Sequence, residues 1–249
     1  MAVSDDFLKV LQVARKIYGL SAGAWDGTVK PLVNLWGFGN ARPVEKAPSE
    51  EEIKTRLQAV GFDQIRIAAS GRVGKTNRAA TLDLASIAKG YGVDAVADLI
   101  RESGYGQFLV EIGGEVVAEG VRKDGKPWMV GISRPVPDDS PGSVYRAIGL
   151  SGGALATSGD YRLFFELDGA RYSHIIDPRT GYPVRNKVVS ASVVAPDCAL
   201  ADGLATALVV MGPEDGLALV NRLKNVECLI ITRSPDGQLS DHASAGFYR

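Results

Sequence analysis

Cysteine is scarce in this chain. The sequence has two cysteines, Cys198 and Cys228, and they lie too far apart to form a CxxC metal-binding pair. Two thiols in a chain of 249 residues are more typical of small buried hydrophobic side chains than of a disulfide or a nucleophile. The cysteines therefore predict a packing role, and they leave the redox compartment undetermined.

The sequence also lacks an excess of charge and a long apolar run. The formal net charge is −1 and no basic run occurs, so nucleic acid is not expected as a partner. No apolar segment approaches the roughly 18 residues that a membrane-spanning helix needs. The first residues, Met1–Asp6, have neither the basic region nor the apolar segment of a signal peptide. The composition, 45% hydrophobic and 23% charged, is that of a globular protein with a hydrophobic core.

Several stretches have the spacing of helices. Apolar residues repeat at helical intervals over residues 5–20, 86–104, 198–212 and 214–223. Ser49 and Glu52 have the spacing of a capping box, which predicts a further helix that ends near Gly61. Asp197 is expected to cap the helix that follows it.

Short segments with the alternation of strands separate these helices. They cover residues 65–67, 73, 80–84, 108–112, 115–117, 128–133, 145–150, 154–157, 161–167, 172–176, 188–195 and 228–232. Gly113–Gly114 and Asp168–Gly169 are hairpin signals. Strands linked mostly by hairpins, with helices in clusters, predict an α+β fold with a mainly antiparallel sheet and flanking helices. No linker interrupts the sequence, so we expect a single domain over residues 1–249.

The stretch from His174 to Thr206 holds residue types that suit phosphate chemistry. Pro178 and Gly181 bracket a turn, so His174 is expected at a strand end just before a loop. Asp202 and Thr206 are four residues apart in a helical pattern, which places a carboxylate and a hydroxyl on one face. Such hard oxygen ligands suit Mg²⁺. The alternatives are a pair on a helix surface and a structural histidine in a strand.

A second set of polar residues clusters where a predicted strand meets a helix. Asp83 closes the strand, and Ser86 and Lys89 follow at the start of the helix. Free backbone N–H groups at such a junction attract phosphate. Taken alone, Lys89 is typical of a solvated charge, and no isolated signal names a reaction.

Six segments taken together resemble a known family. They are GAWDGTVKPLVNLWGFG from residue 23, LDLASIAKGYGVD from 82, VEIGGEVVAEG from 110, ALATSGDYR from 154, HIIDPRTGYP from 174 and ADGLATAL from 201. In this order they are similar to the FAD:protein FMN transferases of the ApbE type. The resemblance runs from about residue 5 to residue 232 and implies an ApbE-like fold, related to the T-fold.

The resemblance implies a Mg²⁺-dependent reaction with FAD as substrate. The FMN half of FAD would pass to a threonine hydroxyl of an acceptor flavoprotein, forming a phosphoester and releasing AMP. The implied Mg²⁺ positions are Ser86, Asp202 and Thr206, and the implied catalytic residues are His174 and Asp202. The positions that match FAD contacts are Ala24, Trp25, Asp26, Asp83, Lys89 and Ile176. For Trp25, packing on a flavin or adenine ring and a place in the core both remain open.

Two features depart from the family pattern. Family members usually carry an N-terminal section, with a first strand and further FAD contacts, that has no counterpart here. Ala85 and Ser86 stand where the family often has glycines, so a metal contact at Ser86 would use its carbonyl. The resemblance favours a bacterial periplasmic protein, with any membrane anchor outside this chain. Two other functions stay open: a Mg²⁺-dependent pyrophosphatase that splits FAD into FMN and AMP, and a protein that holds FAD without turnover.

Overall fold

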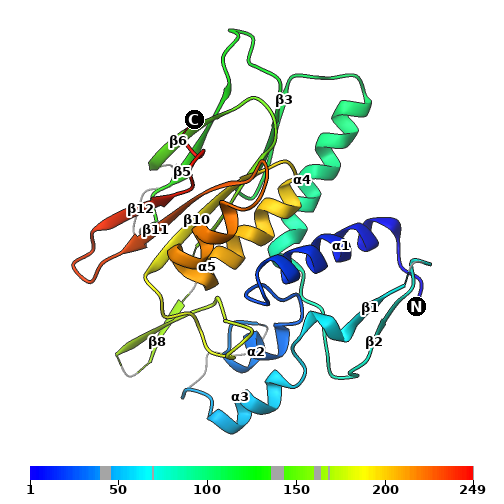
Figure 1. Ribbon diagram of the computed structural model, residues 1–249, viewed down its shortest axis with the longest axis vertical. Coiled ribbons are helices and arrows are strands. Elements are labelled where there is room, and N and C mark those ends of the chain that lie inside the picture. The colour runs from blue at the N-terminus through cyan, green and yellow to red at the C-terminus, as the bar shows by residue number, and fades with distance from the viewer. Residues whose placement is uncertain (40–45, 69, 136–142, 160–163, 168, 249) are drawn as a thin grey trace. The chain divides into compact units, whose positions relative to one another are not determined.

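The chain folds into two compact units. The computed structural model describes residues 1–39, 46–68, 70–135, 143–159, 164–167 and 169–248. The first unit comprises residues 1–85 and 163–186, and the second comprises residues 86–162 and 187–249. Figure 1 labels the elements, and each unit is described by itself. The single domain expected from the sequence stays a prediction.

A six-stranded antiparallel sheet forms the centre of the second unit. Its strand order is β12-β11-β10-β7-β4-β3. The strands are β3 (Phe108–Ile112), β4 (Glu115–Glu119), β7 (Ala154–Gly159), β10 (Val188–Ala195), β11 (Glu227–Arg233) and β12 (Leu239–Ala243). This sheet confirms the predicted α+β class. The edge strand β12 was not predicted, because its sequence LSDHA lacks the β-branched and aromatic residues typical of strands.

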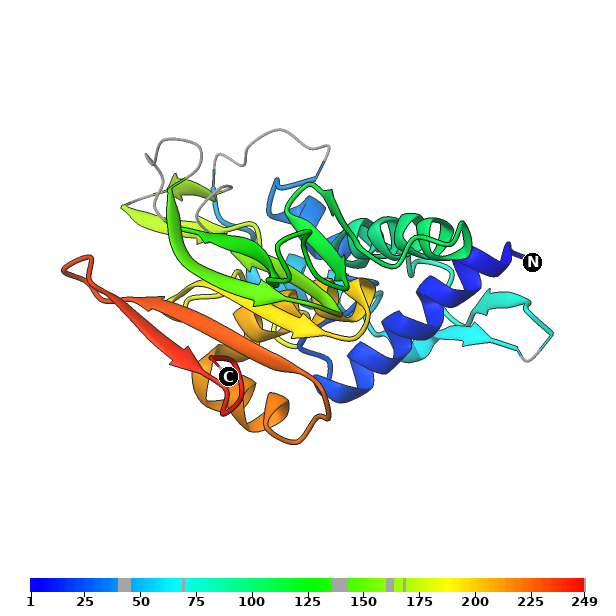
Figure 2. The same cartoon turned by 90° about the horizontal axis from the view of Figure 1, so that it is seen from above.

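Both faces of this sheet are covered. Helices α4 (Ala85–Glu102) and α5 (Cys198–Val220) pack on one face, and the hairpin of β5 (Trp128–Ser133) and β6 (Val144–Leu150) packs on the other. Neighbouring residues of a strand point to opposite faces, so Ala154 belongs to the helix-side core and Leu155 to the hairpin-side core. Figure 2 shows α5 running alongside the sheet. Cys198, the first residue of α5, belongs to the helix-side core, so the start of α5 is packed against the sheet.

The Gly113–Gly114 hairpin is confirmed between β3 and β4. Ile112 pairs with Glu115, which leaves the two glycines as the whole turn. Their φ angles are 65° and 103°, the left-handed conformation that a type I′ turn requires. The turn therefore fixes the register that places Glu115 at the first position of β4.

Helix α5 contains the break that the sequence predicted. Gly212 has φ 81° and ψ 176°, outside helical geometry, and Pro213 follows it. Among helices of the described residues, α5 alone has the length and apolar composition of a membrane span, with 61% of its most apolar window buried. It is thus an exception to the expectation that no apolar segment approaches this length. The break and the burial are features of a core helix.

The first unit holds shorter elements. They are α1 (Asp5–Leu20), α2 (Lys30–Leu35), α3 (Glu50–Leu57), the 3₁₀ turn η1 (Phe62–Gln64), β1 (Ile65–Ile67), β2 (Val73–Lys75), β8 (Phe164–Leu167) and β9 (Ala170–Ser173). The α1 bounds and the Ser49–Glu52 capping box are confirmed. Helix α3 ends at Leu57, before the predicted Gly61. Asp168 of the predicted hairpin signal, and the start of the predicted strand at 161–167, lie outside the described residues.

The strand predicted over residues 80–84 is wrong. This segment has no strand partner, and its backbone bonds to a loop carbonyl and to a lysine side chain instead. Asp83 N–H donates to Gly27 O over 2.7 Å, and Ala80 O accepts from Lys75 Nζ over 2.7 Å. The backbone hydrogen-bonding groups of this segment are therefore satisfied by tertiary contacts rather than by a neighbouring strand.

Gly90 tests the contact between α4 and α5. A Cβ at Gly90 would lie 2.4 Å from Cys198 O and 2.9 Å from Ala199 Cα, both backbone atoms that cannot turn aside. We expect Gly90→Ala to lower the free energy of unfolding by about 1–3 kcal/mol or more, measured by urea denaturation. Gly92→Ala is the matched control, because its Cβ would meet only Ile112 Cδ1 at 3.9 Å. It should be neutral or stabilise by up to about 1 kcal/mol; equal losses in both variants would contradict the close backbone contact.

Candidate active site

Asp202 is buried in the second unit beside the backbone of α4. Its side chain is 3% exposed, and Oδ2 accepts the N–H of Gly90 over 3.1 Å. Burial raises the pKa of Asp202 from 3.8 to about 7; the Gly90 N–H opposes the shift, and the nearby Glu115 carboxylate adds to it. A carboxylate held with so little compensation is suited to bind a cation.

Lys89 lies on the same turn of α4 as Gly90, and it is paired with Glu115. Lys89 Nζ is 2.5 Å from Glu115 Oε1, and the lysine side chain is 48% exposed whereas the glutamate is 2% exposed. Lys89 is also close enough to Asp202 to lower the pKa of that carboxyl. Lys89 is therefore not a simple solvated lysine, because its ammonium group is held by Glu115 beside the candidate site. Glu115 was not identified from the sequence, where it looked like one polar residue of a hairpin.

Oxygen atoms of Thr206 and Ser158 adjoin each other in this unit. Thr206 Oγ1 and Ser158 Oγ are 2.9 Å apart, and Thr206 lies one turn beyond Asp202 on α5. Ser86 lies four residues before Gly90 on α4, so it shares the helix face that contacts Asp202. No group of three His, Cys, Asp or Glu side chains suited to a metal occurs within the described residues. Asp202 offers a carboxylate, and Thr206 and Ser86 on the two helices offer oxygen atoms; such hard donors fit Mg²⁺ better than a softer metal.

The start of α5 is held by a residue that the sequence analysis missed. Asp197 occupies the N-cap position as expected, but its side chain makes no capping bond. The Asp94 carboxylate of α4 accepts the N–H groups of Cys198 and Ala199 instead, each over 2.8 Å. A carboxylate from another helix therefore accepts the backbone N–H groups that the N-cap side chain was expected to bind. It fixes the turn that precedes Asp202.

In the first unit, Asp83 joins two contacts at the start of α4. Its Oδ1 accepts the N–H of Ala85 over 3.2 Å, and its Oδ2 is 3.2 Å from Lys30 Nζ. Asp83 therefore caps the helix that carries Ser86 and Lys89 along the chain. The carboxylate is partly exposed, so it stays accessible to a ligand.

Ala24, Trp25 and Asp26 are all buried in the first unit. The centroid of the Trp25 ring lies 6.3 Å from that of the Phe62 ring. Of the two roles left open for Trp25, this contact and its burial favour a place in the core. Asp26 accepts from Thr28 N–H and Oγ1–H and from Phe62 N–H, at 2.7, 2.6 and 3.0 Å. Burial raises the pKa of Asp26, and these bonds oppose the shift. The Asp26 carboxylate is thus engaged within the protein, and contacts of this triplet with FAD stay a prediction.

His174 follows the last residue of β9, as predicted, and is half-buried. Its ring meets the edge of Phe38 with centroids 6.4 Å apart. The turn after it is fixed on both sides, because Trp36 Nε1 donates to Gly181 O over 2.8 Å and Asp177 binds the Arg179 guanidinium over 2.8 Å. His174 therefore lies next to an exposed turn that these two contacts hold in place.

Ile176 is buried in the hydrophobic core of this first unit. It packs in a cluster with Leu32, Trp36, Ile53 and Tyr172. Its backbone forms a bridge with Pro183. Contact of the Ile176 side chain with a ligand is thus not favoured by its burial, and its match to an FAD-contacting position stays a prediction.

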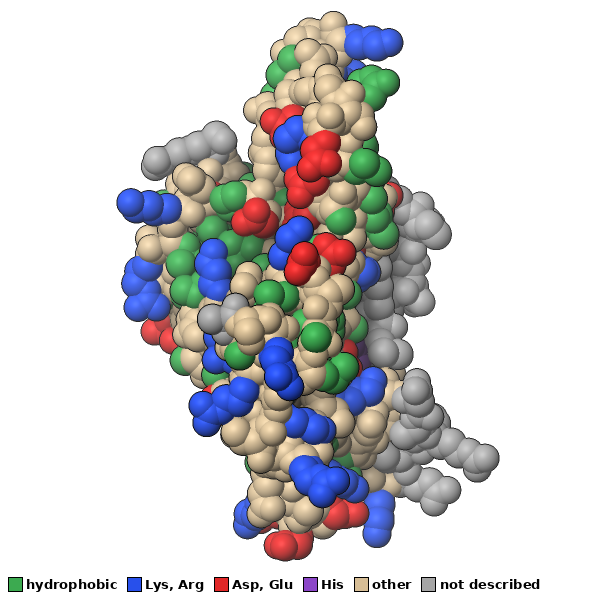
Figure 3. All heavy atoms as spheres, turned by 90° about the vertical axis from the view of Figure 1, so that its right-hand side faces the viewer, with side chains coloured by type: hydrophobic (Ala, Val, Ile, Leu, Met, Phe, Trp, Pro, Cys, Tyr) green, Lys and Arg blue, Asp and Glu red, His purple; other side chains and the backbone are tan. Residues whose placement is uncertain are grey.

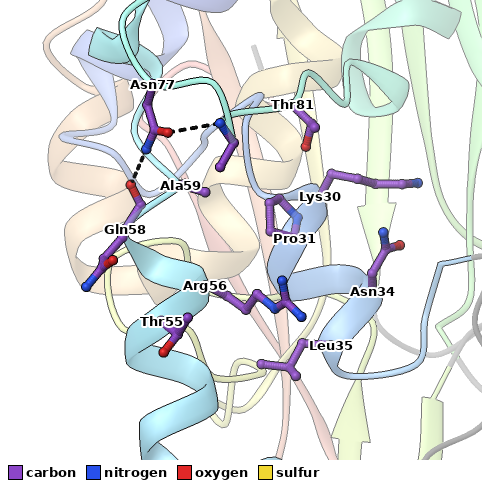
Figure 4. Close-up of a pocket in the computed structure, with 11 residues that line it drawn as sticks. Lys30, Pro31, Asn34, Leu35, Thr55, Arg56, Gln58, Ala59, Asn77 and Thr81 are labelled. Atoms are coloured by element: carbon purple, nitrogen blue, oxygen red, sulfur yellow. Dashed lines mark hydrogen bonds between the residues drawn. The ribbon is translucent and has the colours of Figure 1, made fainter.

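A pocket of about 760 Å³, lined by both polar and apolar side chains, opens in the first unit among α2, α3 and residues 77–81. Figure 4 shows Lys30, Arg56 and Asn77 on its wall. Asn77 is itself fixed, because its amide donates to Gln58 O and accepts from Ala79 N–H. Through the Lys30–Asp83 pair, the pocket borders a residue predicted to contact FAD.

The charged side chains of one face show both signs. In Figure 3, Lys and Arg side chains are separated by neutral and hydrophobic surface, and acidic side chains lie beside several of them. This arrangement agrees with the net charge of −1. The absence of a nucleic-acid partner stays a prediction.

Comparisons with known proteins point to one family. The sequence profile of the ApbE family matches residues 1–230. An FAD:protein FMN transferase of Vibrio cholerae is 45% identical over 247 residues, which are 99% of this chain and 72% of that protein. One of Haemophilus influenzae is 39% identical over 246 residues, 98% of this chain and 70% of that protein. The solved flavin transferase ApbE from Vibrio cholerae superposes with a TM-score of 0.86 at 43% identity, covering 99% of this chain and 77% of that one.

The raised pKa of Asp202 predicts how the stability of the metal-free protein depends on pH. A carboxyl whose pKa rises on folding from 3.8 to about 7 binds its proton more tightly in the folded state. Its contribution to stability is full below the unfolded pKa and is lost as the pH rises through the folded pKa. Relative to Asp202→Asn, the wild type should therefore lose stability between about pH 4 and about pH 7, by on the order of 2–4 kcal/mol.

The measurement is urea unfolding of both proteins in EDTA across this pH range. Asn keeps an oxygen that can accept the Gly90 N–H, so Asp202→Asn removes the charge without removing that bond. If the free energies of unfolding of the two proteins differ by the same amount from acid to neutral pH, ionisation of Asp202 does not destabilise the fold.

Proposed function

The chain belongs to the ApbE family, and we propose that it transfers FMN from FAD to a protein acceptor, as the names of its relatives state for them. It is a flavin transferase, and FAD is its substrate. The acceptor is a flavoprotein, and the acceptor atom is a threonine hydroxyl. A periplasmic location is part of the same proposal and rests on the family resemblance alone.

The observation that carries the proposal is the buried Asp202 carboxylate, together with hydroxyl residues on its own helix and on the helix that contacts it. Asp202 accepts the Gly90 N–H, and Thr206 lies one turn further on the same helix. Ser86 shares the face of α4 that meets Asp202. We infer that Asp202, Thr206 and Ser86 hold Mg²⁺. When bound, Mg²⁺ supplies positive charge that offsets the charge building on phosphate oxygens during the transfer.

Further residues of the chain are proposed to bind FAD. Lys89 places an ammonium group beside Asp202 and so favours the pyrophosphate of FAD there. Asp83, the segment of residues 24–26 and the backbone of Ile176 are the further contacts proposed for FAD. Asp26 acts by holding its own segment in shape, because its carboxylate is bonded to Thr28 and Phe62.

The transfer breaks the phosphoanhydride bond of FAD and forms a phosphoester bond to the acceptor. The threonine oxygen attacks the phosphorus on the FMN side of the pyrophosphate, the bond from that phosphorus to the bridging oxygen breaks, and AMP leaves with the bridging oxygen. The hydroxyl proton passes to His174, which is half-buried and held against Phe38. Lys89 stabilises negative charge on the phosphate oxygens.

Two rival functions share much of this machinery. A pyrophosphatase would use water in place of the threonine and release FMN and AMP. A protein that only holds FAD would release neither. Asp202 and Lys89 act on the phosphate whichever nucleophile attacks, so they do not separate the first two reactions. Positioning of the acceptor hydroxyl does, because holding two reactants together is worth several kcal/mol.

Flavin retained on an acceptor tests the proposed function. With FAD, Mg²⁺ and a flavoprotein acceptor, we expect yellow-green fluorescence to stay on the acceptor through denaturing gel electrophoresis, together with release of AMP. An acceptor whose threonine is replaced by alanine should stay dark. EDTA should abolish the labelling because it removes the ion. The variant Asp202→Ala should abolish it at low Mg²⁺ because the one carboxylate proposed to bind the ion is lost.

Each rival gives a different result in that experiment. AMP released at the same rate with and without acceptor, and no retained fluorescence, would identify a pyrophosphatase. Bound FAD without any AMP would identify a binding protein. Full labelling by Asp202→Ala at low Mg²⁺ would remove Asp202 from the site. Slow hydrolysis of FAD in the absence of acceptor is expected and does not count against transfer.

His174→Ala tests the proton acceptor. General base catalysis contributes about 10²–10⁴-fold, so the rate of transfer should fall by that factor while the dissociation constant for FAD changes far less. His242→Ala is the matched control: it is the other of the two histidines in the chain, lies in β12 and bonds Thr232 Oγ1. Loss of FAD affinity in step with the rate in His174→Ala would make His174 a binding residue instead.

A further inference from the structure

The β3–β4 hairpin surrounds the side chain of Lys89 on two sides. Glu115, the first residue of β4, binds the ammonium group through Oε1. Gly113, in the turn, faces the aliphatic part of the lysine, because a Cβ at that position would lie 3.4 Å from Lys89 Cδ. A charged contact at the tip and a close approach along the stem together restrict the conformations of this side chain.

The pair is asymmetric in a way that suits an orienting role. The Glu115 carboxylate is almost wholly buried, whereas about half of the Lys89 side chain is exposed. Glu115 Oε2 is buried without a hydrogen-bond partner in the described part of the chain. A partly solvated ion pair of this kind gives little stability, and a buried oxygen without a partner costs stability. The carboxylate is therefore not explained by the stability of the fold.

We propose that Glu115 is a positioning residue, which holds the Lys89 ammonium where the phosphates of FAD are bound. This inference rests on the proposed function, and it names a residue that acts through Lys89 rather than on the substrate. Affinity for a phosphate depends mainly on the presence of the positive charge, whereas the chemical step depends on where that charge lies. Removing the Glu115 charge leaves Lys89 charged, but its ammonium group is no longer held in one position.

The expected result of Glu115→Gln is therefore a separation of rate from affinity. We expect the kcat of FMN transfer to fall about tenfold or more. The dissociation constant for FAD, measured by calorimetry, should stay within about twofold of wild type or become tighter, since a neighbouring negative charge has been removed. Glu119→Gln is the matched control, because Glu119 lies on the same strand and also pairs with a cation, Arg101. It should leave both constants unchanged.

A double-mutant cycle with Lys89→Gln tests whether Glu115 acts through the lysine. Without Lys89 there is nothing to direct, and Glu115 is left buried without its cation. The double variant Lys89→Gln/Glu115→Gln should thus be no slower than Lys89→Gln alone. Losses that multiply in the double variant would overturn the proposal, because Glu115 would then act independently of Lys89.

Titration with Mn²⁺, followed by electron paramagnetic resonance, separates this role from that of a cation ligand. Glu115→Gln should bind Mn²⁺ within a fewfold of wild type, whereas Asp202→Ala should lose most of the binding. Equal loss in the two variants would overturn the proposal and make Glu115 a ligand of the ion. Wild-type protein that fails to label an acceptor would refute the proposed function, whereas labelling with an unchanged kcat in Glu115→Gln would refute the positioning role alone.

Discussion

The contact between Gly90 on α4 and the first turns of α5 is the constraint on which the second unit's site depends. A side chain at Gly90 would enter the backbone of Cys198, so the two helices touch through their main chains. This approach lets the Gly90 N–H reach Asp202. Asp94, one turn further along α4, accepts two N–H groups at the start of α5 and fixes the helix in that position. The placement of Asp202 is thus decided by backbone geometry before its own side chain is considered.

Two buried carboxylates in the chain show how structural and functional roles differ. Burial raises the pKa of both Asp26 and Asp202. Asp26 is compensated by three hydrogen bonds from Thr28 and Phe62, which is what a buried polar group needs to support a fold. Among the described residues, Asp202 accepts the Gly90 N–H alone, and the like charge of Glu115 and the opposite charge of Lys89 both act on it. With one hydrogen bond against this burial, the charged form of Asp202 gains more from a bound cation than that of Asp26 does.

Much of the fold could be predicted from the sequence, because its signals were local. The amphipathic spacing of α1, the Ser49–Glu52 capping box and the Gly113–Gly114 turn each act within a few residues. The failures arose from contacts between distant segments. Residues 80–84 satisfy their backbone through loops, and α5 is capped by Asp94 rather than by Asp197. Spacing in the sequence carries no information about such partners.

The candidate site was predictable in the same uneven way. The i, i+4 spacing of Asp202 and Thr206 follows from helix geometry, so their shared face could be read directly. Lys89 and Glu115 are 26 residues apart and meet only because α4 and the β3–β4 hairpin pack together. The buried state of Trp25 also depends on Phe62, far along the chain. Family resemblance supplied the identity of several residues, but not the neighbours that hold them.

Three ion pairs share one arrangement, and two of them include a residue predicted to contact FAD, Lys89 or Asp83. In Lys89–Glu115, Lys30–Asp83 and Arg179–Asp177, the carboxylate is more buried than the cation: the side chains are 2% against 48%, 21% against 35% and 16% against 42% exposed. Two of these carboxylates also accept a backbone N–H, Asp83 from Ala85 and Asp177 from Arg179. Exposed cations of this kind add little to stability. In each pair the more buried acid holds a cation whose side chain stays partly in solvent, where an anionic group can reach it.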